Sequence, residues 1–346
     1  MSEILFSTTW QSPSNIALVK YWGKYGVQMP SNASLSFTLS ECRTETRLEV
    51  LEAGDGPRVE LFLDGENKPS FTPKIEKLLD LVKDDLEWIE DHRFRIHTHN
   101  TFPHSSGIAS SASGMSAFAL CLCDLHQQID GTQFNDFFRR ASRYSRLGSG
   151  SACRSVYGGM AYWGKHEDFP HSSQEYAVPL KDGIHEVFHD FQDTILLVDR
   201  GSKDVSSTIG HDLMLHHPFA QQRFEVANQN MSRLKEILAS GDVDAFVSLV
   251  EREALMLHGL MMSSLPYYIL MKPNTLKIIE KIWEFRKQNG LPVLFTLDAG
   301  ANVHLLYPAS ITHRVEEWIK AELSAFCENN TYICDHVGKG PSRLSK

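Results

Sequence analysis

A loop of small residues in front of an apolar helix is the feature that most constrains this chain. Residues 103–114 read PHSSGIASSASG, and an apolar sequence that reaches about Gln128 follows them. Gly107 permits the backbone conformations that a turn around a phosphate requires. The free N–H groups and the dipole at the start of the helix attract an anion. Serine and glycine clusters also make ordinary caps and turns, but this density before an apolar helix favours a phosphate-binding site.

The common nucleotide-binding and hydrolase motifs do not fit this sequence. The nearest match to a Walker loop, 159–165, is followed by His166 where a serine or threonine should bind magnesium. A dinucleotide-binding fingerprint starting at Gly148 fails because Cys153 stands at the third glycine position. The nucleophile elbow G-x-S-x-G does not occur either. These mismatches exclude the most frequent nucleotide-binding and hydrolase folds.

The order of strand and helix patterns indicates an α+β protein. At 346 residues the chain is about twice as long as a typical domain, so we expect two domains. Residues 4–65 contain five strand-like runs, and 93–99 predict another strand. Apolar spacing of three and four predicts helices from Thr72 and over 132–146.

The pattern changes near residue 190, which sets the expected domain boundary. A buried strand over 193–198 begins the second half. Helices are predicted at 215–240, 242–261, 275–288 and 310–325, and strands at 292–297, 302–307 and 331–337. We therefore expect an N-terminal domain over 1–188 and a C-terminal domain over 189–346.

Composition and charge exclude several classes of protein. Hydrophobic residues make up 42% and charged residues 22%, as in ordinary globular proteins. The net charge of −9 predicts no nucleic-acid partner and no anionic membrane partner. The longest apolar run, 118–123, is too short to cross a bilayer, and no secretion signal is recognised. The six cysteines lack zinc-site spacing, so we expect reduced thiols in a cytoplasmic protein.

The segment NIALVKYWGK at 15–24 places a lysine inside an apolar strand. Strand alternation would put Lys20 on the face of Ile16 and Leu18, opposite Asn15 and Ala17. A single lysine on a strand is often only a solvated residue. A lysine among large apolar groups, however, requires a carboxylate or phosphate partner, because an unpaired buried charge is costly.

Three further segments carry residues suited to a charged ligand. Arg154 lies in the serine-rich segment 148–155, which suits bidentate recognition of a carboxylate or phosphate. Asp298 ends an apolar strand before Gly300; it is either a turn former or a positioned base. The segment 203–208 is either a helix cap or an anion-binding loop.

Together these segments resemble the GHMP kinase superfamily and, within it, the mevalonate diphosphate decarboxylases. The resemblance covers about residues 10–305 and is carried by 15–24 with 31–39, 100–113, 148–155, 203–210 and 297–302. The sequence departs from the family pattern at 104–106, where HSS replaces a threonine and two alanines, and at Tyr25, where a basic residue is usual. The resemblance implies a two-domain GHMP kinase-like fold, with a ribosomal S5 domain 2-like N-terminal domain and a ferredoxin-like C-terminal domain.

The resemblance also implies an activity, its cofactors and an assembly. ATP, with Mg²⁺, would phosphorylate the tertiary hydroxyl of mevalonate 5-diphosphate; loss of phosphate and CO₂ would then give isopentenyl diphosphate. A homodimer is expected from the family. A phosphomevalonate decarboxylase or a mevalonate 3-kinase-like enzyme of the same superfamily is the alternative. A binding protein on this scaffold and a pyridoxal-phosphate decarboxylase are more distant alternatives.

The same resemblance assigns roles to residues. Asp298 would orient the hydroxyl and accept its proton, Lys20 would neutralise Asp298 and the transferring phosphoryl group, and Arg154 would hold the substrate carboxylate. Substrate binding is further assigned to Asn15, Tyr21, Lys24, Ser149, Ser151, Ser206 and Ser207. ATP binding is assigned to Asn100, Gly107, Ser110 and Ser111, with Mg²⁺ held at Ser110 and Ser111.

Overall fold

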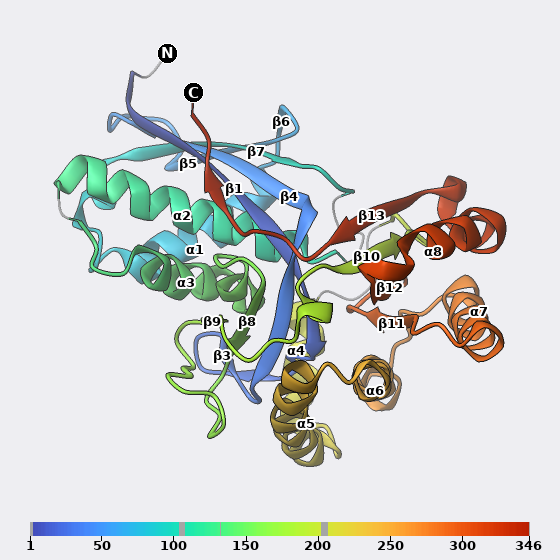
Figure 1. Ribbon diagram of the computed structural model, residues 1–346. Coiled ribbons are helices and arrows are strands. Elements are labelled where there is room, and N and C mark those ends of the chain that lie inside the picture. Colours follow the sequence, from blue (N-terminus) through green and yellow to red (C-terminus); the bar gives the residue numbers. More distant parts are fainter. Residues whose placement is uncertain (1–2, 104–107, 132, 202–206, 346) are drawn as a thin grey trace.

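The computed structural model describes residues 3–103, 108–131, 133–201 and 207–345 (Figure 1). An eight-stranded sheet forms the first part of the molecule, in the order β14-β1-β4-β7-β5-β6, with β8 paired to β4 and β9 to β8. Its strands are β1 (Ile4–Val19), β4 (Ser34–Leu51), β5 (Val59–Leu63), β6 (Glu66–Asn67), β7 (Arg93–Asn100), β8 (Met160–Trp163), β9 (Val178–Leu180) and β14 (Ser342–Arg343). All pairs are antiparallel except β5 with β7. A short hairpin, β2 (Lys24–Tyr25) and β3 (Met29–Pro30), follows β1.

Helices cover one face of this sheet. They are α1 (Thr72–Val82), α2 (Ser110–Asp130) and α3 (Phe137–Gly148), and Figure 1 shows them stacked on the same side. The apolar positions of α1 that recur at three and four, such as Leu78, pack with Phe94 of β7 and Phe118 of α2 in one buried cluster. Burial of this face fixes the start of α2 against the end of the sheet that carries the cavity described below.

The second part is a four-stranded antiparallel sheet with helices packed on it. Its order is β11-β12-β10-β13, with β10 (Phe191–Leu196), β11 (Leu294–Leu297), β12 (Val303–Pro308) and β13 (Tyr332–His336). The helices of this part are α4 (Ser207–Leu213), α5 (Ala220–Ser240), α6 (Val243–Ser263), α7 (Pro273–Asn289) and α8 (Thr312–Trp318). Ile282 of α7, Phe295 of β11 and Trp318 of α8 belong to one buried cluster.

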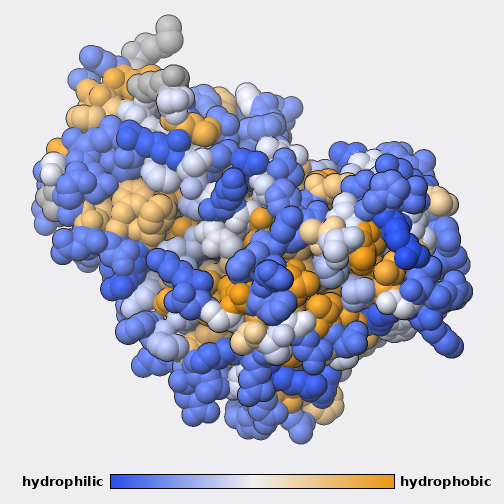
Figure 2. Space-filling model, in the orientation of Figure 1, coloured by the Kyte–Doolittle hydropathy of each residue, from blue (hydrophilic) through white to orange (hydrophobic). Residues whose placement is uncertain are grey.

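A shared apolar core joins the two parts. Phe37 of β4, Leu234 of α5 and Leu249 of α6 are buried in the same cluster. The chain end also returns to the first sheet, where Arg343 of β14 pairs with Trp10 of β1. Figure 2 shows a mostly hydrophilic face with hydrophobic residues gathered near the middle of the view, where the two parts meet. This continuous contact holds residues from both halves of the sequence around one cavity.

The expected α+β class is confirmed, with corrections in detail. The two strand-like runs predicted on either side of Pro13 form the single strand β1, because a register shift between Pro13 and Asn15 lets the pairing with β4 continue. The helix predicted from residue 132 begins at Phe137, where the Asp136 side chain caps it. Strand β8 was not predicted. Within the described residues, no helix is both long and apolar enough to cross a bilayer.

Candidate active site

A cavity of about 560 Å³ lies where the first sheet, the start of α2 and the end of β11 meet. Eleven of the predicted site residues line it: Asn15, Lys20, Tyr21, Lys24, Asn100, Ser110, Ser111, Ser149, Ser151, Arg154 and Asp298. Two predicted residues, Gly107 and Ser206, lie outside the described residues. The same holds for the side chain of Ser207, although its backbone begins α4. The cavity therefore collects residues that are separated by up to 283 positions in the chain.

Lys20 reaches the cavity by a route that simple alternation does not predict. Strand β1 ends at Val19, and a register shift lies between Ala17 and Val19. The shift changes the parity of the strand, so Lys20 lines the cavity together with Asn15 and Ala17. The expectation that Lys20 shares a face with Ile16 is therefore wrong, since Ile16 packs in the apolar core.

The ammonium group of Lys20 is buried and uncompensated by hydrogen bonds. The residue is 2% exposed, and no described residue accepts a hydrogen bond from its Nζ. Burial lowers the pKa of Lys20 from 10.5 to about 8, although the negative charges of Asp298 and Glu253 oppose that shift. A buried ammonium whose hydrogen-bond donors are not used by the described residues is a strong site for an anionic ligand.

A buried ion pair holds the backbone of Lys20. Glu253 of α6 accepts a hydrogen bond from the Lys20 N–H at 2.9 Å, and Arg223 of α5 donates to the Lys20 carbonyl at 3.1 Å. Arg223 also donates two hydrogen bonds of 2.7 Å to the Glu253 carboxylate, and Asn230 adds one of 2.6 Å. The Arg223 and Glu253 side chains are at most 1% exposed. Helices α5 and α6 of the second part thus hold the backbone of Lys20, which belongs to the first part.

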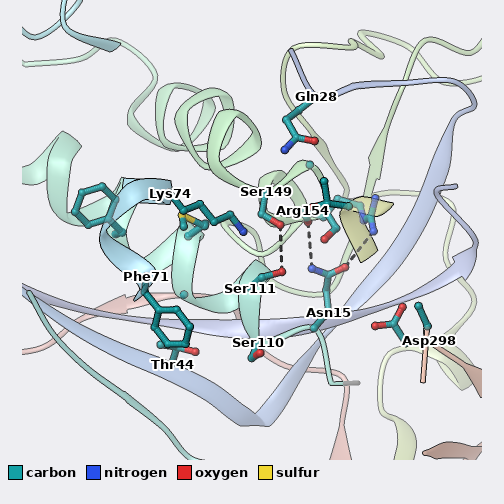
Figure 3. A pocket seen from close by; sticks show the side chains of 18 of the residues that line it. Asn15, Gln28, Thr44, Phe71, Lys74, Ser110, Ser111, Ser149, Arg154 and Asp298 are labelled. Atoms are coloured by element: carbon teal, nitrogen blue, oxygen red, sulfur yellow. Dashed lines mark hydrogen bonds between the residues drawn. The ribbon is translucent and has the colours of Figure 1, made fainter. Parts of the chain in front are cut away.

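Asp298 follows directly after β11 and brings the carboxylate to the cavity. Its carbonyl oxygen lies 3.1 Å from Nε2 of His258, which belongs to α6. In Figure 3 the Asp298 side chain extends toward Asn15 and lies on the same side of the cavity as Arg154. Electrostatic contact with Asp298 acts on the pKa of both Lys20 and Arg154. The acid predicted from sequence therefore shares one site with both predicted cations.

Arg154 is buried and held by side chains on three sides. Its Nε donates to Ser36 at 2.8 Å, Nη1 to Ser34 at 2.7 Å and Nη2 to Asn15 at 3.3 Å. Asn15 in turn donates to the Ser155 hydroxyl at 2.7 Å (Figure 3 shows Asn15 beneath Arg154). A guanidinium has five N–H donors, so after these contacts with described residues one N–H on each terminal nitrogen is left for a ligand. That fork suits a carboxylate.

The serines gather at the start of α2. Ser110 and Ser111 are its first residues, and Ala109 before them has φ of 48°. The Ser111 hydroxyl lies 3.3 Å from that of Ser149 (Figure 3), and Asn100 accepts from Thr44 at 2.7 Å. The helix N-terminus and these hydroxyls form a polar wall that suits a phosphate.

Sequence reasoning missed one cation of the cavity, Lys74. It projects from α1, and in Figure 3 it extends toward Ser111 and Ser149. Desolvation of the ammonium group by the surrounding cavity wall, with a smaller effect of Lys24, lowers the pKa of Lys74 to about 8. The only signal in the sequence was its position next to the buried Ile75 on an amphipathic helix, since Lys74 itself keeps an exposed surface. With Lys74, the cavity presents four cationic side chains although the chain as a whole carries a net charge of −9.

The polar wall also offers the oxygen atoms that Mg²⁺ prefers. Among the described residues no group of three His, Cys, Asp or Glu side chains is placed to hold a metal ion. Mg²⁺ in phosphate-transfer sites is bound largely through phosphate oxygens and water. The hydroxyls of Ser110 and Ser111 fit a supplementary role beside such phosphates, so the predicted residues are compatible with a nucleotide-borne magnesium ion.

Two family models match the two halves of the chain in order. Residues 12–176 match the diphosphomevalonate decarboxylase-like N-terminal domain, and residues 194–343 match the mevalonate 5-diphosphate decarboxylase C-terminal domain. The chain belongs to the diphosphomevalonate decarboxylase family. The family expected from the sequence motifs is therefore confirmed, and the domain boundary at 188/189 stays a prediction.

Individual members of this family are similar along most of the chain. The diphosphomevalonate decarboxylase of Candida albicans is 28% identical over 88% of this chain and 84% of its own length. That of Saccharomyces cerevisiae is 29% identical over 88% and 78%.

Solved structures of the family match the fold as a whole. The mevalonate diphosphate decarboxylase of Staphylococcus aureus has a TM-score of 0.84 at 27% identity, and 98% of each chain is covered. The enzyme of Enterococcus faecalis has a TM-score of 0.83 at 26% identity. A further structure, described as MDDEF in complex with MVAPP, AMPPCP and magnesium, has a TM-score of 0.84 at 26% identity. These likenesses confirm the two-domain α+β fold.

Proposed function

We propose that this chain catalyses the ATP-dependent decarboxylation of mevalonate 5-diphosphate to isopentenyl diphosphate. One observation carries the proposal. In this chain, which belongs to the family, the carboxylate of Asp298 lies in the same cavity as the buried cations Lys20 and Arg154. The buried arginine fork suits a substrate that carries a carboxylate, as mevalonate and its phosphates do. The matched family members are named for this reaction.

Asp298 and Lys20 act on the substrate hydroxyl. Asp298 orients the tertiary hydroxyl and accepts its proton as the oxygen attacks the γ-phosphorus of ATP. A tertiary alcohol is a crowded nucleophile, so positioning supplies much of the rate. Lys20 is held by its backbone, and its ammonium stabilises the negative charge on the transferring phosphoryl group.

Arg154, which Asn15 positions, holds the substrate carboxylate while the carbon skeleton fragments. The bond from the tertiary carbon to the phosphorylated oxygen breaks first, and phosphate leaves with the electron pair. The carboxylate then departs as CO₂, and the electrons of its carbon–carbon bond form the alkene. Because an oriented carboxylate must remain ionised for this step, a fixed guanidinium is well suited to hold it. Ser151, whose carbonyl accepts from Asn15 at 3.3 Å, supports the same region.

The opposite wall binds ATP. Ser110, Ser111 and Lys74 hold the phosphates, and Asn100 lies toward the nucleotide. Mg²⁺, when bound, neutralises charge on the nucleotide phosphates. Tyr21, Lys24, Ser149, Ser206 and Ser207 are proposed to bind the diphosphate of the substrate, of which the first three line the cavity.

A comparison of substrates tests the proposal against its nearest alternative. The purified protein is incubated with ATP, Mg²⁺ and either mevalonate, mevalonate 5-phosphate or mevalonate 5-diphosphate, and kcat/KM is measured from ADP release. We expect the diphosphate to be preferred by at least about 100-fold, since each charge-assisted phosphate contact stabilises the complex by ~1.5–3 kcal/mol. A preference for the monophosphate or for unphosphorylated mevalonate contradicts the proposal and favours a phosphomevalonate decarboxylase or a 3-kinase.

We further propose a cytoplasmic homodimer. The six cysteines have no disulfide partners and five are buried, which supports a reducing compartment. The exposed apolar side chains of Leu265, Tyr267 and Ile269 support an additional protein contact. Sedimentation equilibrium distinguishes the assemblies: a mass near twice 39.2 kDa supports the dimer, and a mass of one chain refutes it.

A further inference from the structure

His211 of α4 is a histidine of the cavity to which the proposed mechanism gives no role. It lines the cavity and is 8% exposed. Its ring packs against two aromatic side chains, with centroid distances of 4.3 Å to Tyr21 and 4.5 Å to Trp22. A side chain that is packed this closely has a defined orientation, so its free ring nitrogen points in a fixed direction.

The structure fixes the tautomer of His211. The backbone N–H of Gly23 donates a hydrogen bond of 3.0 Å to Nδ1, so Nδ1 is the acceptor and the ring proton is on Nε2. Two glycines make this contact possible. Gly23 has φ of +99°, and a Cβ there would lie 2.8 Å from Phe224. A Cβ on Gly210 would lie 2.6 Å from Trp22, so α4 approaches this wall only with glycine at that position.

The charge state of His211 is equally restricted. Burial, with a smaller effect of Lys24, lowers the pKa of His211 to about 3, while Asp298 opposes the shift. The ring is therefore neutral at physiological pH. Nδ1 is occupied and Nε2 is protonated, which excludes a role as general base. Among the described residues none accepts a hydrogen bond from Nε2, so this N–H is a neutral donor available at the cavity wall.

We propose that His211 is a further substrate-binding residue, whose neutral Nε2–H donates a hydrogen bond to a phosphate oxygen of the phosphorylated substrate. This inference rests on the proposed function, in which Tyr21 and Lys24, the neighbours of His211, meet that phosphate. Its electrostatic contact with Asp298 places the ring on the side of the substrate hydroxyl. The contact binds an anion without adding a further cation to the four that line the cavity.

Two isosteric variants separate the two ring nitrogens. The side-chain oxygen of asparagine can occupy the position of Nδ1, so H211N keeps the acceptor for the Gly23 N–H and loses the donor at Nε2. A glutamine amide reaches the position of Nε2, so H211Q keeps the donor. By calorimetric titration we expect H211N to weaken binding of mevalonate 5-diphosphate by about tenfold. We expect H211Q to stay within about threefold of the wild type.

Titration with a non-hydrolysable ATP analogue in the absence of substrate identifies which phosphate is bound. We expect its affinity to be unchanged in both variants. If H211N binds mevalonate 5-diphosphate as tightly as the wild type, or if the variants weaken the ATP analogue instead, the proposal is overturned. Thermal unfolding of both variants checks that each is folded.

A measurement on the wild type tests the role of His211 even if a variant fails to fold. Nitrogen-15 NMR of labelled histidine reports the tautomer directly, and pyrophosphate serves as the probe ligand. We expect His211 as the Nε2–H tautomer, with a change in the Nε2 resonance on addition of pyrophosphate. An Nδ1–H tautomer, or no change, overturns the inference. The NMR readout needs no turnover, so it tests the role of His211 independently of the proposed function. Failure of the proposed function would instead appear as a lack of decarboxylation by the wild type.

Discussion

The Glu253 carboxylate accepts a hydrogen bond from the backbone N–H of Lys20 at 2.9 Å, across 233 residues of sequence. Five residues further along α6, His258 contacts the carbonyl of Asp298. One helix thus holds the backbone of both the cation and the acid of the proposed reaction. Helix α6 therefore contributes to their relative position in addition to the strands that lead into them.

Substitution E253Q tests this role of α6. It removes a charge and leaves Arg223 buried without its ionic partner, so we expect the free energy of unfolding to fall by about 3 kcal/mol. We also expect kcat to fall by at least about tenfold as Lys20 loses its alignment. Chemical denaturation and steady-state kinetics measure the two effects.

The matched control is E251Q on the same helix. Glu251 pairs with Arg286 at 2.7 Å and has no contact with Lys20 among the described residues. We expect E251Q to lose stability while it retains kcat. Equal losses of kcat in the two variants would show that E253Q acts only through destabilisation.

The pH dependence of the reaction reports the lowered pKa of Lys20. The protonated ammonium stabilises the phosphoryl group, and in the free enzyme its pKa is about 8. We therefore expect kcat/KM to fall as the pH rises above about 8. In K20R the side chain stays charged, so the decline in kcat/KM that is due to Lys20 moves to a pH above the measured range. The K74R variant removes only the part of the decline that is due to Lys74. A wild-type profile that is flat from pH 7 to 9.5 would rule out this assignment.

Burial of Lys20 costs stability in the absence of ligands. Its pKa is 10.5 in the unfolded chain and about 8 in the folded chain, so between these values the unfolded state binds the extra proton. The free energy of unfolding therefore rises with pH through this window, and the penalty is complete below pH 8. We expect K20M to be more stable than the wild type by about 3 kcal/mol at pH 7.

The advantage of K20M should shrink toward pH 10.5, where the wild-type lysine is neutral in the folded state and half deprotonated in the unfolded state. Denaturation curves of both proteins at pH 7, 9 and 10.5 give this difference, in which contributions of other titrating groups cancel. An inactive K20M that is less stable than the wild type at pH 7 would contradict the account of Lys20 as a cation whose desolvation outweighs its attraction to Asp298 and Glu253.

Asp298 should matter for the rate and little for affinity. D298N keeps the shape of the side chain and removes the proton acceptor, so we expect kcat to fall by roughly 10²–10⁴-fold with a KM within about threefold. D182N, a substitution of an exposed aspartate, is the control for the expression and handling of a charge variant. Near-normal turnover of D298N would remove Asp298 from the mechanism.

Local patterns predicted much of this architecture and most of the cavity. The α1 spacing, the apolar helix after the serine-rich loop and the strand before Asp298 depend on short-range periodicity, and each is found in the structure. The resemblance of the sequence motifs to a known family predicted that Lys20, Arg154 and Asp298 share one site. These features depend on residues close in sequence or on recognisable segments.

Features that depend on tertiary contacts could not be predicted in the same way. The bulge after Ala17 changes which face Lys20 occupies, and it is set by pairing with β4. Lys74 looks like an ordinary exposed helix residue in the sequence, and only the tertiary fold makes it part of the cavity wall. The Arg223–Glu253 pair joins two helices to a strand end, and no spacing in the sequence indicates it.

The ratio of CO₂ to ADP tests the central claim most directly. The purified protein is supplied with ATP, Mg²⁺ and mevalonate 5-diphosphate labelled in its carboxyl group, and both products are counted in the same reaction. Because phosphorylation and fragmentation occur in one cavity, we predict one CO₂ released for each ADP formed. ADP formation without CO₂ would contradict the account and identify the protein as a kinase.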